Sequence, residues 1–243
     1  RDPFVTAKET CRGATIELAI WWVQWVSARG QSAHEISSAQ TETPPFDDIK
    51  CALSLEIADL GHDGEVTRAI VGRYLPTLYH YAPDWTREHL PRIFCAPSAE
   101  LREAAWASYL LHAWPSVGLY PMMAALYEAE VSDIDSSKRE DSGYRVKRLG
   151  EHLLLLYLYG AMQLSDVLLQ RFLKGASDEL RRHLMWAVDQ HLRLDTDRFP
   201  APARERAYGY WENRLAIASH SELRDDFESE LGVIGLWTGN PSL

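Results

Sequence analysis

Histidine is a common protein ligand for zinc, so the spacing of the nine histidines bears on whether a metal site is present. His183 and His191 share one predicted helix but are eight positions apart, about 12 Å along a helix axis. That separation is too long for both rings to bind one ion from successive turns. His80 and His89 lie on either side of a predicted turn, and the chain has neither an H-E-x-x-H nor a C-x-x-C motif. We therefore predict no metal site and interpret the histidines as scattered surface or capped residues.

The three cysteines, Cys11, Cys51 and Cys95, are far apart and odd in number. This pattern is typical of cytosolic proteins, in which small buried thiols stay reduced, and it predicts a cytoplasmic location. Cys95, in "RIFCAPS" near a predicted helix end, could act as a nucleophile, but it would need a base and an oxyanion site. The sequence assigns neither. We interpret Cys95 as a buried structural thiol and predict no catalytic residue.

Two acidic clusters could hold a metal ion between them. Carboxylates such as those of "DDFESE" at 225–230 can bind Mg²⁺ and a diphosphate, as in isoprenoid synthases. That chemistry needs a second acidic cluster at the same cavity, and "FDDIK" at 46–50 is the one candidate. There the acidic pair also suits a helix start, where it complements the helix dipole. A compact helical enzyme using Mg²⁺ near Asp47 and Asp225 is an alternative interpretation; the favoured one has no cofactor.

The segment "RERAYGYWENRL" at 204–215 interleaves arginines with Tyr208, Tyr210 and Trp211. Arginine stacked on an aromatic ring can bind nucleotides or anions. The same pattern on the outer helix of a stack more often packs helices together, and we favour that interpretation. No glycine-rich phosphate loop accompanies it, because "GLWTGN" at 235–240 reads as the end of a helix.

Charge and hydropathy argue against two classes of partner. The 243 residues carry a formal net charge of −10 and no basic stripe, which argues against nucleic-acid binding. The longest apolar run, at 153–162, is too short to span a bilayer, and we expect no signal peptide. The chain begins with Arg1, so we expect a segment of a longer protein in preference to a processed chain.

Hydrophobic periodicity predicts helices throughout and no strand. The predicted helices cover 6–30, 48–60, 64–82, 84–94, 98–114, 116–131, 144–160, 163–175, 177–192, 202–219 and 221–237. Predicted helix ends include a C-cap at Gly61 and N-caps at Asp84, Ser98, Ser165, Ser177 and Ser221. Pro76 is expected inside its helix.

Pairs of these helices suggest the fold. The pairing of 64–82 with 84–94, and of 98–114 with 116–131, favours antiparallel hairpins of HEAT type, although no fixed repeat period is present. We predict an all-α, HEAT-like α-solenoid or an irregular helical-hairpin array. Its two halves, 1–132 and 144–243, would be joined by an exposed linker at 133–143.

Two stretches rich in aromatic residues show helical spacing of their apolar residues. In the first predicted helix, apolar residues recur at helical spacing at Ile16, Ala19, Trp22, Val23 and Val26. In "LREAAWASYLLHAW", one face consists of Leu101, Ala105, Ser108 and Leu111, with Trp106, Leu110 and Trp114 alongside. So wide an apolar arc predicts a helix covered on two sides, with Trp106 and Tyr109 as packing residues.

Several of these stretches together resemble a known helical region. They are "VTRAIVGRYLPTLYHYAPDWTREHLPRIF", "REAAWASYLLHAWPSVGLYPMMAALYEAEV", "LGEHLLLLYLYG", "RERAYGYWENRL" and "ELGVIGLWTGN", with "ETCRGATIELAIWW" at the start. The succession resembles the C-terminal HEAT-like region of large bacterial antiphage defence proteins. In those proteins a SIR2-like or nuclease effector, often with a STAND-type P-loop ATPase, precedes a long helical array.

The resemblance implies a sensor that binds a trigger while distant domains respond. This chain has no Walker A lysine and no SIR2 nucleotide-binding pattern, so ATPase, NADase or nuclease activity would lie outside it. We expect a non-catalytic protein-recognition or sensor module. Its expected partners are a protein trigger, which a phage could encode, other domains of a parent protein and a second copy of itself, but neither nucleic acid nor membrane.

Two features of the surface separate this interpretation from its rivals. Recognition by a concave, acidic face predicts a basic partner whose binding weakens as salt rises, whereas salt-independent binding indicates an apolar interface. A purely structural spacer, the remaining alternative, predicts a surface with no contiguous apolar patch.

Overall fold

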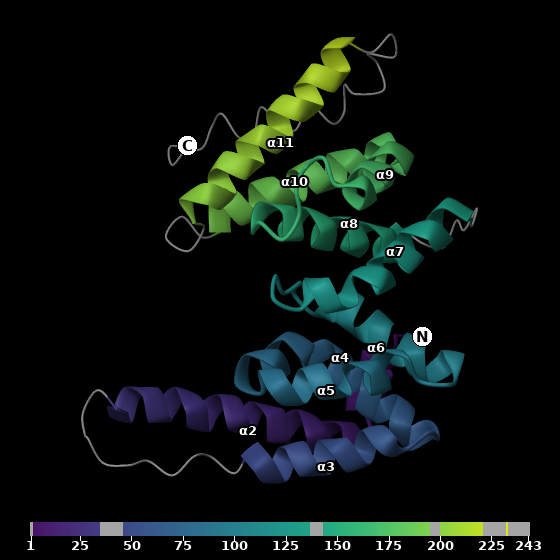
Figure 1. Ribbon diagram of the computed structural model, residues 1–243, viewed down its shortest axis with the longest axis vertical. Helices are drawn as coiled ribbons and strands as arrows, with labels where there is room; N and C mark the ends of the chain where they lie inside the picture. Colours follow the sequence, from purple (N-terminus) through teal and green to yellow (C-terminus); the bar gives the residue numbers. More distant parts are fainter. Residues whose placement is uncertain (1, 35–45, 137–142, 195–199, 221–231, 233–243) are drawn as a thin grey trace. The chain divides into compact units, whose positions relative to one another are not determined.

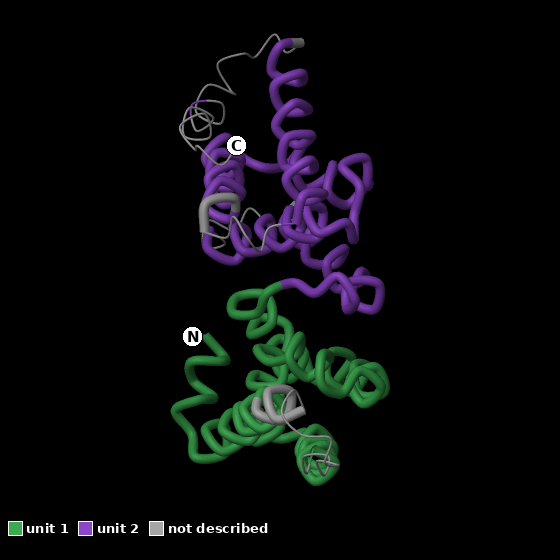
Figure 2. Tube along the Cα trace, turned by 90° about the vertical axis from the view of Figure 1, so that its left-hand side faces the viewer, with its two compact units in different colours: residues 1–114 green, residues 115–243 purple. Residues whose placement is uncertain are grey.

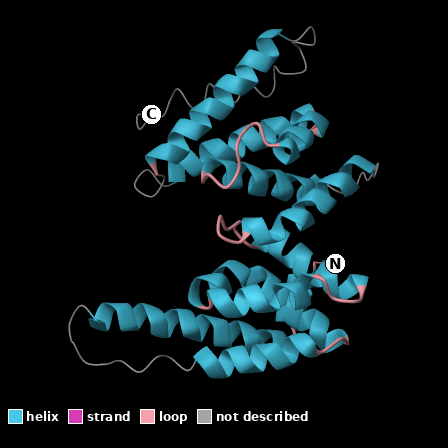
Figure 3. Cartoon of the chain, viewed as in Figure 1, coloured by secondary structure: helices cyan, strands magenta, loops and turns pink. Residues whose placement is uncertain are grey.

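The computed structural model describes residues 2–34, 46–136, 143–194, 200–220 and 232. Within these ranges the regular secondary structure is entirely helical, without a strand, so the protein is all-α as predicted (Figure 3). No helix there combines the length and hydropathy needed to cross a membrane. The solenoid arrangement itself stays a prediction.

The helices follow the predicted ranges to within a few residues, apart from the first and the last predicted segments. In chain order they are α1 (Pro3–Lys8), α2 (Cys11–His34), α3 (Phe46–Ala58), α4 (His62–Tyr81), α5 (Pro83–Phe94), α6 (Ala99–His112), α7 (Tyr120–Ser136), α8 (Gly143–Leu158), α9 (Val167–Gly175), α10 (Asp178–Leu194) and α11 (Ala201–His220) (Figure 1). The predicted helix at 221–237 lies outside the described residues, except for its position 232.

The single helix predicted over 6–30 is instead two helices, because a turn near Thr10 interrupts it. The hydroxyl oxygen of Thr10 accepts a hydrogen bond from the backbone N–H of Gly13 at 2.9 Å and so caps the start of α2. A Cβ at Gly13 would lie 2.1 Å from the carbonyl oxygen of Ala7. The close turn between α1 and α2 therefore requires glycine at this position.

The chain forms two compact units, Arg1–Trp114 and Pro115–Leu243 (Figure 2). The predicted linker at 133–143 is not the boundary, because its first residues belong to α7 and its last begins α8; residues 137–142 lie outside the described part. The helix α7 packs against α8 and α9, which assigns it to the second unit. The boundary is Pro115, a residue that cannot continue α6.

The helix α4 is the centre of the first unit and packs against α1, α2, α3, α5 and α6. Its buried apolar and small residues lie along the whole helix and include Val66, Ala69, Ile70, Val71, Gly72, Tyr74, Leu75 and Leu78. A Cβ at Gly72 would lie 2.3 Å from the carbonyl oxygen of Ala105, so glycine allows α6 to approach α4 closely. The main neighbour of α6 is thus α4, whereas the predicted partner of 98–114, the segment 116–131, belongs to the second unit. Pro76 lies inside α4, as predicted.

Arg68 on α4 is buried, with 1% of its surface exposed, and binds four backbone carbonyls. Its Nη1 donates to the oxygens of Asp59 at 2.8 Å and Gly64 at 3.2 Å; its Nη2 donates to those of Ile57 at 2.6 Å and Arg92 at 3.3 Å. Carbonyls at a helix C-terminus have no intrahelical donor and carry partial negative charge. A single guanidinium therefore joins the ends of α3 and α5 to the start of α4. Burial lowers the pKa of Arg68. Because the ordinary pKa of arginine is very high, the guanidinium stays charged at neutral pH.

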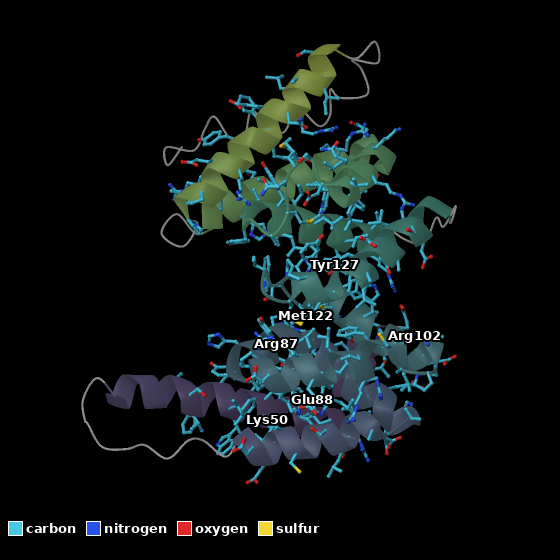
Figure 4. All side chains as sticks on the ribbon, in the orientation of Figure 1. Lys50, Arg87, Glu88, Arg102, Met122 and Tyr127 are labelled. Atoms are coloured by element: carbon cyan, nitrogen blue, oxygen red, sulfur yellow. The ribbon has the colours of Figure 1, made fainter. Side chains whose placement is uncertain are left out.

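The helix α8 is the centre of the second unit and packs against α7, α9, α10 and α11. Every residue from Leu153 to Leu158 is buried, so the first part of the longest apolar run, 153–162, forms core, whereas Tyr159 is exposed. His152 and Tyr127 are fully buried, and the Tyr127 Oη lies 3.0 Å from the His152 Nδ1. This hydrogen bond satisfies two polar groups between α7 and α8, in the region where Tyr127 is labelled in Figure 4.

Two predicted N-caps are confirmed. The Ser98 Oγ accepts from the backbone N–H of Leu101 at 3.1 Å at the start of α6, and the Ser177 Oγ accepts from that of Leu180 at 3.2 Å at the start of α10. Ser221 lies outside the described residues.

Three other predicted helix ends are wrong. Asp84 is inside α5, because Pro83 takes the first helical position and suits it without an N–H. Gly61 is the N-cap of α4 with a φ of −91°, not a left-handed C-cap of α3. Ser165 is displaced by Asp166, which precedes the first residue of α9.

The stretch at 101–114 is mostly core. Trp106 and Tyr109 are 6% and 1% exposed, and their rings stack with centroids 5.7 Å apart. Phe94 of α5 meets Trp106 edge-on at 6.5 Å. Trp114, which was expected alongside them, is 56% exposed because α6 ends at His112. Trp106 and Tyr109 therefore belong to the core, and Trp114 does not.

Replacement of Trp106 with alanine tests this assignment. We expect Trp106→Ala to lower the free energy of unfolding by about 3 to 5 kcal/mol, because a large aromatic leaves a cavity. Thermal unfolding followed by circular dichroism would measure the loss, with Trp114→Ala as the control that should change little. An unchanged melting temperature for Trp106→Ala would show that the core assignment is wrong.

Removal of the Arg68 guanidinium tests its role in joining three helices. We expect Arg68→Leu to lower the free energy of unfolding by roughly 3 kcal/mol or more, because each buried carbonyl left without a donor costs about 1–3 kcal/mol. The matched control is Arg73→Leu, on the same helix but half-buried over the Tyr74 ring, for which we expect a loss of about 1 kcal/mol or less. Equal losses in urea unfolding would contradict the proposed role.

Candidate functional site

The histidines considered as metal ligands do not converge. His89 is buried, its ring stacks on Trp85 with centroids 4.6 Å apart, and its Nδ1 lies 3.0 Å from the Trp85 carbonyl oxygen. His80 is exposed and meets the ring of Tyr81. Across the described ranges no group of three or more histidine, cysteine, aspartate or glutamate side chains could hold a metal ion.

His183 instead belongs to an ion-pair cluster between α8 and α10. Its Nε2 lies 2.7 Å from the Glu151 Oε1, and the same carboxylate accepts a hydrogen bond from Arg148. Burial by itself would raise the pKa of Glu151, but the His183 hydrogen bond and the Arg148 charge outweigh it and lower that pKa. Burial lowers the pKa of His191, which lies about two turns further along α10. The cluster joins two helices that already pack together.

The prediction of buried thiols is wrong. Cys11, Cys51 and Cys95 are all exposed and free. Cys95 follows the last residue of α5 as its C-cap, where the chain leaves the core. Its neighbours in sequence, Phe94 and Ala96, are buried, so the apolar context misled the prediction.

The acidic clusters do not form a magnesium site within the described residues. Asp47 and Asp48 are exposed in the first turn of α3, where Asp47 pairs with Lys50 (Lys50 is labelled in Figure 4). The cluster at 225–230 lies outside the described residues.

The aromatic residues of 204–215 divide between core and surface. On α11, Tyr210 is fully buried, Trp211 is half-buried and Tyr208 is exposed. This arrangement agrees with helix packing.

A different aromatic cluster is exposed on α2. Leu18, Trp21, Trp22 and Trp25 are 61%, 49%, 42% and 53% exposed, and we call them the α2 aromatic face. Residues three and four positions apart are neighbours on a helix, so the four side chains form one contiguous strip. Single exposed apolar residues are common, but a strip with three tryptophans is not.

The opposite side of α2 packs on the first unit. Ile16, Ile20 and Val23 are buried, and α2 contacts α1, α3 and α4. Trp22, which recurs at helical spacing with Ile16 and Val23 in the sequence, therefore lies on the other side of the helix. The helix is apolar on two sides. The W-W-x-x-W pattern at 21–25 indicates the second apolar side in the sequence.

Polar contacts hold the α2 aromatic face in place. The Trp21 Nε1 donates to the Tyr74 Oη at 2.9 Å, and that hydroxyl donates to the Glu17 Oε1 at 2.6 Å. One turn later the Gln24 Nε2 donates to the Thr77 Oγ1 at 3.2 Å. Burial, followed by the hydrogen bond to Glu17, raises the pKa of Tyr74 to about 12. The exposed ring of Trp21 is thus anchored to α4 through its indole N–H.

The exposed side chains that the structure describes on α2 carry no charge. From residue 11 to residue 28 its exposed positions are Cys11, Thr15, Leu18, Trp21, Trp22, Trp25 and Ala28. The charged side chains within this range, Arg12 and Glu17, are half-buried and paired within the first unit. In a chain with a net charge of −10 this neutral strip is well suited to an apolar partner.

Comparison of the chain with protein-family models, with curated proteins and with solved structures gave no match. No family follows from these comparisons, and the resemblance to bacterial defence proteins stays a prediction. The functional argument therefore depends on the geometry of the α2 aromatic face.

The pH dependence of stability tests the hydrogen bonds of Tyr74. Its pKa in the folded protein, about 12, lies above the ordinary value of 10.0. The contribution of the hydroxyl to stability is therefore complete below pH 10 and lost as the pH rises towards 12. We expect the free energy of unfolding of the wild type to fall relative to that of Tyr74→Phe over this interval. Urea unfolding of the wild type and of Tyr74→Phe at each pH gives the difference between their free energies of unfolding. The ionisation of the other tyrosines contributes equally to both proteins and cancels in this difference. A difference that stays constant with pH would contradict the assignment.

Proposed function

We propose that this chain is a non-catalytic protein-recognition module and that the α2 aromatic face is its recognition surface. The observation that carries the proposal is the exposure of three tryptophans and a leucine on one strip of a helix whose other side is firmly packed. The exposed part of these side chains is on the order of 400 Å², taking about 200 Å² or more for a whole aromatic side chain. Apolar patches of that size on a monomer are often functional.

The chemistry of the strip indicates what it binds. Tryptophan is enriched among the residues that dominate binding energy at protein interfaces, where it fills apolar pockets of the partner. The spacing 18, 21, 22 and 25 is that of a helix presenting anchors to a groove or to the apolar side of another helix. We infer a protein partner with a complementary apolar surface, in which the indole rings are buried on binding.

The absence of charge on this face changes the expected salt dependence. The net charge of the chain predicts a basic partner and binding that weakens with salt. The exposed positions of α2 between 11 and 28 carry no charge, so binding through them should respond little to ionic strength. Salt dependence therefore distinguishes recognition by α2 from recognition by an acidic surface elsewhere.

We further propose, following the resemblance, that the chain acts in the cytoplasm as the trigger sensor of a larger bacterial defence protein. In this proposal recognition is the contribution of the chain, and catalysis belongs to other domains of the parent protein. The spacer alternative fits less well, because it predicts a surface without a contiguous apolar patch and α2 presents one. For the magnesium-enzyme alternative, one of its two acidic clusters lies outside the described residues, and the other is paired on the surface of α3.

Variants of the α2 aromatic face test the proposal. We expect the double variant Trp22→Ser, Trp25→Ser to fold with a loss of about 1 kcal/mol or less, because both rings are half exposed. Wild-type and variant chains would be used as baits against lysates of phage-infected and uninfected cells. Loss of a key aromatic should weaken binding at least about tenfold, since such residues contribute 2 kcal/mol or more.

The matched control is Trp186→Ser, which removes a tryptophan of similar exposure (45%) from α10 in the second unit. A protein retained from infected cells by the wild type and by Trp186→Ser, but not by the double variant, would support the proposal. Retention by all three baits would assign recognition to another surface. A concentration-dependent dimer in sedimentation velocity that Trp22→Ser abolishes would assign the face to self-association instead.

A further inference from the structure

A pocket of about 420 Å³ lies in the first unit, where α3 and α5 end close to the start of α4. Its apolar lining comes from the C-terminal parts of α3 and α5 and the residues that follow them. These residues are Ile57, Ala58, Leu60, Pro91, Ala96 and Pro97. The polar residues that line it are Arg68, Arg92 and Cys95. A concave site with an apolar wall and a few polar groups is the usual form of a small-molecule site, and the volume lies in the usual range.

Arg68 gives this pocket a buried positive charge. Its four Nη hydrogen bonds all go to backbone carbonyls, and its Nε has no hydrogen-bond partner in the described part of the chain. The charge of the Asp59 carboxylate acts on Arg68, but its Oδ1 accepts from the backbone N–H of Gly61. A buried cation whose only direct partners are neutral carbonyls is electrostatically incomplete.

A second cation lies beside the first. Arg92 lines the pocket from α5, and its side chain is exposed while its carbonyl accepts from Arg68. Among the residues that line the pocket there is no acidic side chain. The pocket is thus locally positive in a chain of net charge −10, which favours an anionic ligand there.

We propose that this pocket binds a small organic acid, with its carboxylate on the guanidinium of Arg92 in the field of the buried Arg68 charge and its apolar body against Leu60, Pro91 and Pro97. The exposed guanidinium of Arg92 is suited to a carboxylate, because its N–H groups match the two oxygens, whereas the Nη groups of Arg68 already donate to carbonyls and Arg68 contributes its charge. The apolar lining selects an acid with a hydrocarbon or aromatic body over a small inorganic anion. This site is independent of the α2 aromatic face, because the two share no residue.

Cys95 provides a direct measurement of occupancy. Its exposed thiol lines the pocket, whereas Cys11 and Cys51 are exposed elsewhere in the same unit and serve as internal controls. The full chain would be alkylated with N-ethylmaleimide in the presence of hexanoate, decanoate, benzoate or naphthoate, each compared with its neutral amide. Labelling at each cysteine would be read by mass spectrometry of the peptides.

We expect a carboxylate with a large apolar body to protect Cys95 alone. At a naphthoate concentration about ten times Kd, alkylation of Cys95 should slow about tenfold, because labelling then proceeds from the free fraction. The amide should protect far less, since it carries no charge for Arg68 and Arg92. Isothermal titration calorimetry of the same pairs gives Kd without reference to the thiol.

Arg92 can be replaced without disturbing the core, because its side chain is exposed. We expect Arg92→Gln to weaken carboxylate binding about threefold to fivefold, as for the loss of a partly exposed charge. The matched control is Arg87→Gln on the same helix (Figure 4), where the arginine pairs with Asp84 and does not line the pocket. That variant should bind as the wild type does.

Three outcomes would overturn the proposal. Equal protection by acid and amide would show that the charge of the pocket is not used. Protection by inorganic phosphate as strong as that by naphthoate would identify a general anion site and not one for organic acids. Protection of all three cysteines together would indicate a change in the whole fold. None of these outcomes bears on the α2 aromatic face, so the two proposals fail separately.

Discussion

The first unit depends on one buried guanidinium. Three helices, α3, α4 and α5, end or begin near Arg68, and the carbonyls at the two C-terminal ends need donors that no helix can supply internally. Arg68 supplies them from α4, whose remaining sides pack against α1, α2 and α6. The orientation of the central helix therefore follows from a polar contact as well as from apolar burial. The same guanidinium places a positive charge beside a pocket. One residue therefore contributes both to the stability of the unit and to the proposed binding of an anionic ligand.

The α2 aromatic face has a comparable dependence on α4. Its inner side is held by Ile16, Ile20 and Val23, and the indole N–H of Trp21 is bound by the hydroxyl of Tyr74. An exposed tryptophan that is anchored in this way loses little conformational freedom on binding. Rigid aromatic anchors on a packed scaffold are what a recognition surface requires. The same central helix thus supports both the proposed recognition face and the proposed pocket, through different residues.

Helix ends were predicted correctly from the sequence where one side chain alone is sufficient to cap the helix. The hydroxyls of Ser98 and Ser177 each accept from a backbone N–H of the helix they start, and both caps were predicted. Prediction failed where a neighbour competes: Pro83 takes the helix start expected at Asp84. It also failed for the unit boundary, because the charged segment at 133–143 has the composition of a linker while the packing of α7 assigns that helix to the second unit.

By itself the sequence determined that the protein is all-α, since the 3.6-residue period, the caps and the prolines are local properties that survive in any packing arrangement. It also placed Trp106 and Tyr109 in the core, because α6 is apolar over so wide an arc that both must be covered. Only the tertiary structure decided that Trp22 is exposed and that Cys95 is not buried. The period of a helix shows which residues share a face, but burial depends on which neighbours are present to cover it. For α2, apolar on two sides, the neighbours α1, α3 and α4 cover one side and leave the tryptophans exposed on the other.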